Sequence, residues 1–264
     1  MASQRSLLTA IEREVRACRP LALRYFRSAR LRVSRKADQS PVTAADRAIE
    51  ARLRQALRRL APGEAILGEE YGRSGPPGRS YWTIDPIDGT RAFSRGLPSW
   101  GIMVGRVDQG VATLGVVDFP AVDATIAVAP GVRAFERVQT SSRLLPRARR
   151  APALKDAVLF HGGLQWWTPT RFARGFTRLV QGCYLERGYG DCYGYWWVLR
   201  GSADAVLDYG VKPWDLVPFA ALAASTGYAL TDFSGRRSFS GPETIMAHPS
   251  FVKTIVGYLQ SSKR

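Results

Sequence analysis

Hydrophobic and polar positions recur along the first sixty residues with the period of amphipathic helices. Residues 3–28 carry apolar side chains at helical spacing, and Pro20 is expected to kink or split this helix because proline lacks a backbone N–H. Residues 41–60 predict a stronger helix, with Thr43 as its N-cap and Asp46 three residues later. The apolar stripe of this helix consists of Ile49, Leu53, Leu57 and Leu60.

Short apolar runs bounded by turn residues predict strands in the middle of the chain. The first run, residues 81–84, leads into an acidic turn. Residues 101–107 and 110–120 are two further runs joined through residues 108–110, and residues 123–131 follow as the next run. This order predicts an antiparallel meander.

The second half of the chain mixes both patterns. Strands are expected at residues 156–160 and 203–210, on both sides of a helix near 170–181. A further helix is expected at 214–226, two short strands follow, and residues 250–259 predict a closing helix. Because helices and strands are interspersed, the pattern predicts a layered α/β or α+β fold.

The length and composition of the chain are consistent with such a fold. The chain has 264 residues, of which 45% are hydrophobic, so it can bury a large core in one unit or in two closely packed lobes. It has no run of about 18 apolar residues, and its first twenty residues mix acids and bases, unlike a secretion signal. Three irregularly spaced cysteines are too few for a disulfide framework or a thiolate metal site. We therefore expect a cytoplasmic protein.

The charge is strongly basic. A net charge of +16 and a sequence pI near 10.5 are typical of proteins that bind nucleic acids or acidic surfaces. The basic residues are mostly arginines spread along the chain, with dense groups only at 52–59, expected to be a solvated helix face, and 143–150, expected to be an exposed loop. No nucleic-acid-binding motif accompanies the charge, so nucleic-acid binding is kept only as an alternative. The positive charge should also attract small anions to any cleft that it surrounds.

Two aspartates flank a proline and an isoleucine in the segment "DPIDGT" at residues 85–90. A turn in this segment is expected to place the carboxylates of Asp85 and Asp88 on one small exposed surface. The backbone N–H groups of Gly89 and Thr90, at the start of a helix, would form a binding site for a phosphate group.

Further acids stand at the boundaries of other predicted elements. Glu69 and Glu70 follow an apolar strand end, and Asp215 opens a helix. Carboxylate oxygens at such positions suit Mg²⁺, which prefers octahedral oxygen coordination. Two such ions would activate a water and stabilise the leaving oxygen of a phosphate ester. The two histidines, His161 and His248, lack the spacing of zinc ligands.

Each of these features also has a purely structural interpretation. The alternatives are a capping box for Thr43 and Asp46, an ordinary turn at Asp85–Pro86, a helix cap for Asp215 and a solvated pair for Glu69–Glu70. Their joint occurrence in one chain is what favours a functional site.

Four segments, taken in order, resemble the inositol monophosphatase family of Mg²⁺-dependent, lithium-sensitive phosphatases. They are "SPVTAAD" at 40–46, "GEE" at 68–70, "DPIDGT" at 85–90 and "WD" at 214–215. Each segment alone is weak evidence, whereas four in the same order are specific. The resemblance extends from about residue 5 to residue 260.

The resemblance implies a fold and an organisation. The fold would be α+β, a layered α-β-α-β-α sandwich of the inositol monophosphatase/fructose-1,6-bisphosphatase type. Residues 1–264 would form a single unit, with an N-terminal α+β lobe over about 1–140 and a C-terminal α/β lobe over about 150–264. Most metal ligands would lie in the first lobe and Asp215 in the second, and the protein would be a homodimer.

The resemblance also implies a role for each acidic residue. The ligands of two or three Mg²⁺ ions would be Glu69, Asp85, the Ile87 carbonyl, Asp88 and Asp215. Glu70 would help to hold a metal-bound water, and Asp46 with Thr90 would polarise the water that attacks phosphorus directly, without a covalent intermediate. Lys36 and Asp38 would support the site.

Three segments are similar to the branch of the family that dephosphorylates histidinol phosphate. They are "GTRAFSRGLPSWG" at 89–101, "YGDCYGY" at 189–195 and "GVKPWD" at 210–215. In this interpretation Asp191 and Asp208 would receive the amine and imidazole of the substrate, although Asp208 stands where both branches usually carry glutamate. In an inositol phosphatase the same two acids would accept ring hydroxyls.

Other substrates and another class of function stay open. Related families act on nucleotide-derived phosphates such as 3′-phosphoadenosine 5′-phosphate or on fructose 1,6-bisphosphate, and the excess of arginine would suit such doubly charged substrates. A catalytically silent nucleic-acid-binding protein would instead bind RNA or DNA in a salt-dependent manner and be indifferent to Mg²⁺.

Overall fold

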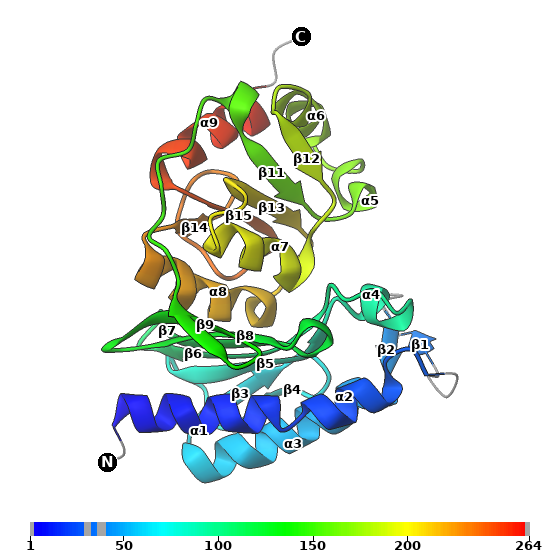
Figure 1. Ribbon diagram of the computed structural model, residues 1–264, viewed down its shortest axis with the longest axis vertical. Helices are drawn as coiled ribbons and strands as arrows, with labels where there is room; N and C mark the ends of the chain where they lie inside the picture. The colour runs from blue at the N-terminus through cyan, green and yellow to red at the C-terminus, as the bar shows by residue number, and fades with distance from the viewer. Residues whose placement is uncertain (1–2, 29–32, 36–40, 262–264) are drawn as a thin grey trace. The chain divides into compact units, whose positions relative to one another are not determined.

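The computed structural model describes residues 3–28, 33–35 and 41–261. The chain divides into two compact units, Met1–Leu144 and Leu145–Arg264, called unit 1 and unit 2 below (Figure 1). Each unit has its own sheet and its own hydrophobic core.

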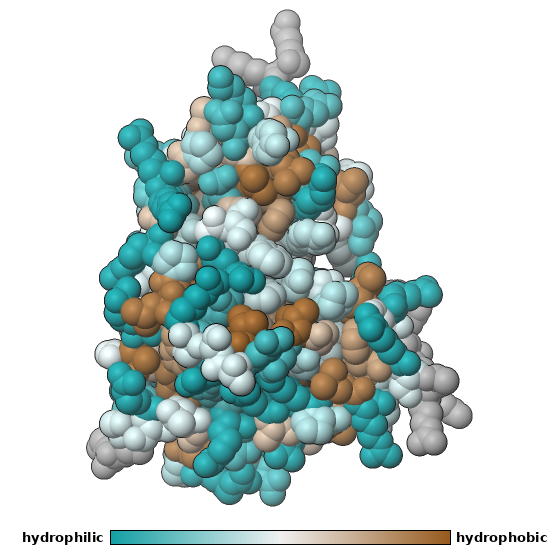
Figure 2. All heavy atoms as spheres, viewed as in Figure 1, coloured by the Kyte–Doolittle hydropathy of each residue, from teal (hydrophilic) through white to brown (hydrophobic). Residues whose placement is uncertain are grey.

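The surface is polar, with scattered apolar groups. In the part of the chain that the structure describes, no helix has the length and apolar character needed to cross a membrane. On the face that Figure 2 shows, apolar residues occur in separate small groups among hydrophilic ones. Scattered apolar residues of this kind are normal on a folded domain.

Unit 1 begins with two helices where the sequence predicts one helix interrupted by proline. They are α1 (Gln4–Arg16) and α2 (Arg19–Tyr25), and Pro20 stands in the first turn of α2, where its missing N–H needs no partner. The next helix, α3 (Ala44–Leu60), begins at Thr43, whose hydroxyl accepts a hydrogen bond from the first turn. The split helix and the N-cap are both confirmed.

An eight-stranded sheet forms the centre of unit 1, in the order β10-β9-β8-β7-β6-β5-β3-β4. Its strands are β3 (Ala65–Gly68), β4 (Gly72–Ser74), β5 (Tyr81–Asp88), β6 (Gly101–Asp108), β7 (Val111–Phe119), β8 (Ala124–Ala129), β9 (Val132–Val138) and β10 (Ser141–Leu144). Neighbours from β5 to β10 are antiparallel, which confirms the predicted meander, whereas β3 and β5 are parallel. The other elements described in this unit are β1 (Val33–Arg35), β2 (Pro41–Thr43), α4 (Thr90–Ser94) and the 3₁₀ turn η1 (Pro120–Val122).

Three strands of this sheet, β4, β9 and β10, are missing from the sequence-based prediction. All four residues of β10 are exposed, and β9 carries charged residues between its apolar ones. The prediction of a loop over residues 143–150 is wrong for residues 143 and 144, which belong to β10. A short, charged edge strand has no apolar pattern because one of its sides faces water rather than another strand.

Helices α1 and α3 pack on the same face of this sheet (Figure 1). The core includes Ile11 and Val15 from α1, Ile49 and Leu53 from α3, and Trp82 and Ile102 from the sheet. Trp82 is fully buried, and burying an apolar side chain contributes roughly 1.5–3 kcal/mol. This core supports β5, the strand that carries the acidic segment.

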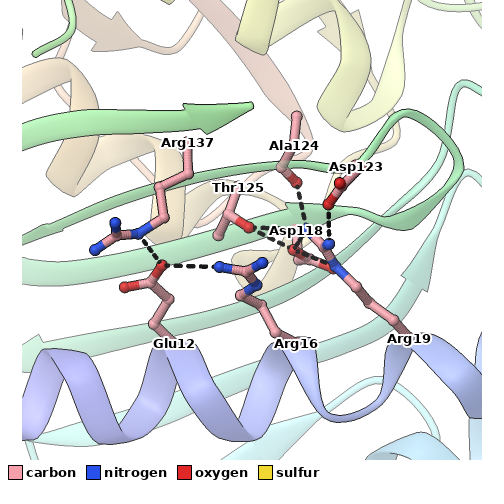
Figure 3. A network of polar contacts seen from close by, with 8 residues as sticks. All are labelled: Glu12, Arg16, Arg19, Asp118, Asp123, Ala124, Thr125 and Arg137. Atoms are coloured by element: carbon pink, nitrogen blue, oxygen red, sulfur yellow. Dashed lines mark hydrogen bonds and ion pairs between the residues drawn. The ribbon is translucent and has the colours of Figure 1, made fainter. Parts of the chain in front are cut away.

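A network of charged side chains fastens the start of α2 to the sheet (Figure 3). The guanidinium of Arg19 donates to both carboxylate oxygens of Asp118, with Nε–Oδ2 at 2.8 Å and Nη2–Oδ1 at 2.7 Å. Asp118 has no exposed side-chain surface, and Thr125 Oγ1 donates to its Oδ1 at 2.6 Å. Arg19 also pairs with Asp123. A buried carboxylate is tolerated here because a bidentate arginine and a hydroxyl hydrogen-bond to it.

Unit 2 contains a five-stranded mixed sheet in the order β12-β11-β13-β15-β14. Its strands are β11 (Val158–His161), β12 (Leu185–Arg187), β13 (Ala205–Tyr209), β14 (Ala229–Thr231) and β15 (Glu243–Ala247). Its helices are η2 (Leu154–Asp156), α5 (Leu164–Trp167), α6 (Ala173–Gln181), α7 (Asp191–Leu199), α8 (Pro213–Thr226) and α9 (Pro249–Gln260). Because β11 is parallel to both β12 and β13, the carboxyl ends of these three strands lie at one edge of the sheet.

Helices cover both faces of this second sheet. Leu207 of β13 shares a core with Phe176 of α6 and Ile255 of α9. The preceding residue, Val206, points to the opposite face and lies so close to α7 that a Cβ added to Gly194 would be 3.0 Å from Val206 Cγ2. The strands and helices predicted for this half are confirmed, whereas α5 and β12 are too short to show a periodic pattern and were not predicted.

Replacing Arg19 with alanine should lower the free energy of unfolding by about 3 kcal/mol, because it leaves the buried Asp118 carboxylate without its cation. Arg59→Ala is the matched control, since Arg59 is 57% exposed and lies 3.6 Å from Glu14; it should cost less than about 1 kcal/mol. Urea denaturation followed by circular dichroism measures both. Equal losses in the two variants would contradict the role assigned to the network.

Candidate active site

Strand β5 carries two of the predicted metal ligands. The strand continues through Asp85 to Asp88, and its pairing with β6 shifts between these residues, as in a β-bulge. The expectation of an exposed turn is therefore wrong: Asp85 is 2% and Asp88 8% exposed. The shift in pairing leaves a carboxylate oxygen of each aspartate within 4.8 Å of one from the other. This separation is short enough for both carboxylates to bind one cation.

The parallel pairing of β3 with β5 brings a second acidic pair to the same end of the sheet. Gly68, the last residue of β3, is opposite Ile84, and Glu69 N donates to the Ile84 carbonyl at 3.2 Å. Glu69 and Glu70, which follow β3, therefore lie beside the part of β5 that starts at Asp85. Both glutamates are half-buried.

The loop after β3 is held by Glu50, a residue that lies outside the four sequence motifs. Its buried carboxylate accepts hydrogen bonds from Glu70 N at 2.6 Å and from Arg54 Nε at 2.7 Å. Glycine is needed at position 68 because a Cβ there would lie 2.0 Å from Glu50 Oε1. The available signal was spacing: Glu50 is four residues from Asp46 and from Arg54, so all three lie on one face of α3.

The backbone after β5 turns sharply at Gly89, which has a φ of 82° and precedes α4. The Thr90 hydroxyl donates to the Ile87 carbonyl at 2.9 Å, and its oxygen is 3.5 Å from Asp46 Oδ1. The Ile87 N–H in turn donates to Asp85 Oδ1 at 3.1 Å. The structure thus brings Thr90 to Asp46, which comes from a helix 44 residues earlier in the chain.

Asp46 is fully buried and completes the capping box of α3. Its Oδ2 accepts hydrogen bonds from the Thr43 N–H at 2.8 Å and from the Thr43 hydroxyl at 2.5 Å. Burial raises the pKa of Asp46 to about 6; the negative charge of Glu69 adds to the rise and the hydrogen bonds from Thr43 oppose it. Asp46 therefore does form the capping box that the structural alternative predicts, and its other carboxylate oxygen, Oδ1, faces Thr90.

Unit 2 holds the other three predicted acids. Asp208, on β13, is buried, and its carboxylate accepts hydrogen bonds from Tyr209 N at 2.9 Å and Asp191 N at 3.3 Å. Burial raises the pKa of Asp208 to about 8, and the negative charges of Asp191 and Asp215 add to the rise. Asp215 is half-buried in the first turn of α8 and accepts a hydrogen bond from Lys212 N at 2.7 Å. Within this unit the structure thus brings Asp191 and Asp208 together.

Two residues expected to support the site, Lys36 and Asp38, lie outside the described residues. In unit 1 the predicted ligands at the shared end of β3 and β5 are carboxylate and carbonyl oxygens of Glu69, Asp85, Ile87 and Asp88. Such a hard, oxygen-only donor set fits Mg²⁺ rather than zinc or copper.

Comparison with known proteins identifies the fold. The model of the inositol monophosphatase family matches residues 3–262. The histidinol-phosphatase of Mycobacterium tuberculosis is 35% identical over 205 residues, 78% of this chain and 79% of that protein. The histidinol-phosphatase of Chlorobaculum parvum is 31% identical over 248 residues, 92% and 93% of the two chains. The structure of the Thermotoga maritima IMPase superposes with a TM-score of 0.81 at 26% identity, covering 95% of each chain. The predicted fold class is confirmed.

Asp208→Asn should change how stability depends on pH. In metal-free buffer with EDTA, Asp208 ionises near pH 4 in the unfolded wild type, whereas in the folded protein its pKa is about 8. Between these two values a rise in pH therefore lowers the free energy of unfolding of the wild type. Asparagine does not titrate. The unfolding free energy of the variant minus that of wild type should therefore grow by more than about 1.4 kcal/mol, the value of one pKa unit, between pH 4.5 and 8.

Urea titrations of both proteins at several pH values measure this difference. Asp156→Asn, at an exposed position of η2, is the control and should give a difference independent of pH. A constant difference for Asp208→Asn, or one that shrinks as pH rises, would show that Asp208 is ionised like an ordinary surface acid.

Proposed function

The chain belongs to the inositol monophosphatase family and is a phosphatase of that family, and we propose that it hydrolyses histidinol phosphate to histidinol and inorganic phosphate with bound Mg²⁺. The observation that carries this choice of substrate is the pair of acids in unit 2 formed by the buried Asp208 and the exposed Asp191, whose N–H donates to the Asp208 carboxylate. Two relatives at 31% and 35% identity, both named histidinol-phosphatase, support it.

The metal ligands that we propose are the oxygen donors at the ends of β3 and β5 together with Asp215. They are Glu69, Asp85, the Ile87 carbonyl, Asp88 and Asp215. Bound there, two or three Mg²⁺ ions would act as Lewis acids on the phosphate and lower the pKa of a coordinated water. The buried carboxylates favour ion binding because a cation relieves the repulsion between acids that burial intensifies.

The groups that handle the attacking water come from three elements of unit 1. In the structure the Thr90 hydroxyl donates to the Ile87 carbonyl at 2.9 Å, and Asp46 Oδ1 lies 3.5 Å from the Thr90 oxygen. In the proposed reaction the hydroxyl donates to Asp46 instead, which leaves its lone pairs to accept a proton from water. Glu70 lies in the loop after β3, where its backbone N–H donates to Glu50, and its side chain holds the same water. The amides of Gly89 and Thr90 donate to the phosphate oxygens. Attack is then direct, without a covalent intermediate.

The other end of the substrate would bind to the acids of unit 2. An ammonium group donates up to three hydrogen bonds, and Asp191 and Asp208 supply only acceptors when ionised. Because each carboxylate raises the cost of ionising the other, a bound cation stabilises both at once. A neutral polyol gains less from the same pair.

Inositol 1-phosphate is the second candidate, because hydroxyl groups also donate to carboxylates and the Thermotoga maritima protein of similar fold is named an IMPase. The arginine excess keeps 3′-phosphoadenosine 5′-phosphate and fructose 1,6-bisphosphate as further candidates. A homodimeric state, a cytoplasmic location and sensitivity to lithium are also part of the proposal, and they rest on the family resemblance alone.

A substrate panel tests the proposal. Phosphate release is measured with Mg²⁺ and with EDTA from L-histidinol phosphate, inositol 1-phosphate, 3′-phosphoadenosine 5′-phosphate and fructose 1,6-bisphosphate. We expect Mg²⁺-dependent turnover with kcat/KM at least about tenfold higher for histidinol phosphate, a difference of 1.4 kcal/mol. Preference for inositol 1-phosphate would contradict the substrate while leaving the metal chemistry intact. Activity that is unchanged in EDTA would contradict the metal site.

Asp88→Asn should lower kcat/KM at least about a hundredfold while the protein stays folded, because it removes a ligand charge and preserves the volume of the side chain. Asp156→Asn, the exposed control, should keep wild-type activity. The measurement combines steady-state kinetics in Mg²⁺ with circular dichroism of each variant. Near-normal turnover by Asp88→Asn would remove Asp88 from the ligand set.

A further inference from the structure

Unit 2 exposes two large aromatic side chains in the loops that follow its parallel strands. Trp166, in α5 after β11, is 43% exposed, and Tyr189, after β12, is 46% exposed. The carboxyl ends of β11, β12 and β13 lie at one edge of the sheet. In open α/β sheets, ligands bind outside this edge. The two aromatic residues are thus placed where a ligand is expected.

The indole of Trp166 lies directly beside the strand that carries Asp208. A Cβ built on Gly210, two residues after Asp208, would be 3.9 Å from the Trp166 ring, which is ordinary van der Waals contact. Gly210 has a φ of 91°, a conformation that favours glycine. The chain thus passes from the buried acid to the indole within two residues.

Glycines also bring the neighbouring loops close to Asp208. A Cβ on Gly162 would lie 1.9 Å from Asp208 Oδ1, and one on Gly190 would lie 2.9 Å from Oδ2. Asp191, the next residue, donates its N–H to the same oxygen and has a φ of 54°, which is uncommon for a residue other than glycine. The backbone of the loops after β11 and β12 therefore converges on the buried carboxylate of Asp208, with Asp191 hydrogen-bonded to it and Trp166 beside Gly210, two residues further along the chain.

The two acids and the indole ring together favour one class of ligand. The face of an indole attracts cations and stacks on planar groups, and it cannot accept the directed hydrogen bonds that a polyol offers. The acid pair likewise favours a cation over a neutral group. An organic cation with a flat ring satisfies both, whereas a sugar or an inositol ring satisfies only the acids.

We propose that Trp166 is a specificity-determining residue that lies against the cationic, ring-bearing end of the substrate while Asp191 and Asp208 bind its charge. This inference rests on the proposed function, because it assumes that the substrate is a phosphomonoester with an organic cation. It goes further by assigning selection between cationic and polyol substrates to an aromatic residue of α5.

The test compares wild type with Trp166→Leu, which keeps an apolar side chain and removes the aromatic face. In Mg²⁺, KM and kcat are measured with L-histidinol phosphate, and inorganic phosphate is titrated as a competitive inhibitor that lacks a cation. KM for histidinol phosphate should rise about five- to thirtyfold, with kcat and the inhibition constant of phosphate within twofold of wild type. Trp166→Phe should restore most of the affinity.

Tyr184→Leu is the matched control, because Tyr184 is 74% exposed and stands before β12, at the amino ends of the parallel strands. It should leave KM unchanged. An unchanged KM in Trp166→Leu, or equal losses for histidinol phosphate and inorganic phosphate, would overturn the inference while the proposed function stands. If the wild type itself does not hydrolyse histidinol phosphate, the proposed function fails and the inference fails with it.

Discussion

The parallel pairing of β3 with β5 is the constraint on which the acidic site of unit 1 depends. It sets Gly68 opposite Ile84, so two chain segments that each end in acidic residues stop at the same end of the sheet. Every carboxylate placed there repels the others, and backbone hydrogen bonds fix the segments that carry them. Glu69 N donates to the Ile84 carbonyl of β5, Glu70 N donates to the Glu50 carboxylate, and Ile87 N donates to Asp85 Oδ1.

The same physical arrangement recurs in unit 2. Three parallel strands end together, glycines let the following loops approach Asp208, and a backbone N–H fixes the position of Asp191. In both units burial raises the pKa of a carboxyl group, to about 6 for Asp46 and about 8 for Asp208. A raised pKa means that burial disfavours the ionised form of each group, and under the proposed function a metal ion in unit 1 and an organic cation in unit 2 would stabilise that form.

The sequence predicts most of this fold because its helices and buried strands are periodic. The capping box at Thr43, the split at Pro20 and the meander from β5 to β8 follow from local rules and are confirmed. The edge strand β10 and the bulge in β5 do not follow from them, because exposure on one side and a shift in register leave no apolar pattern. The predicted exposure of Asp85 and Asp88 failed for this reason.

The candidate residues could be named from four short motifs, but their supports could not. Glu50 accepts a hydrogen bond from a backbone N–H twenty residues away, and the Trp166 ring lies beside Gly210; neither contact leaves a local signature in the sequence. The roles of the acids, including Asp215, stay predictions until a metal is observed with its ligands.

The most direct measurement of the central claim is a crystal structure with Mn²⁺ and inorganic phosphate, recorded with anomalous scattering. The account predicts anomalous peaks about 2.1–2.2 Å from carboxylate oxygens of Asp85, Asp88 and Asp215, with phosphate near the Gly89 and Thr90 amides. Peaks bound to other residues, or phosphate seated away from the ends of β3 and β5, would contradict it.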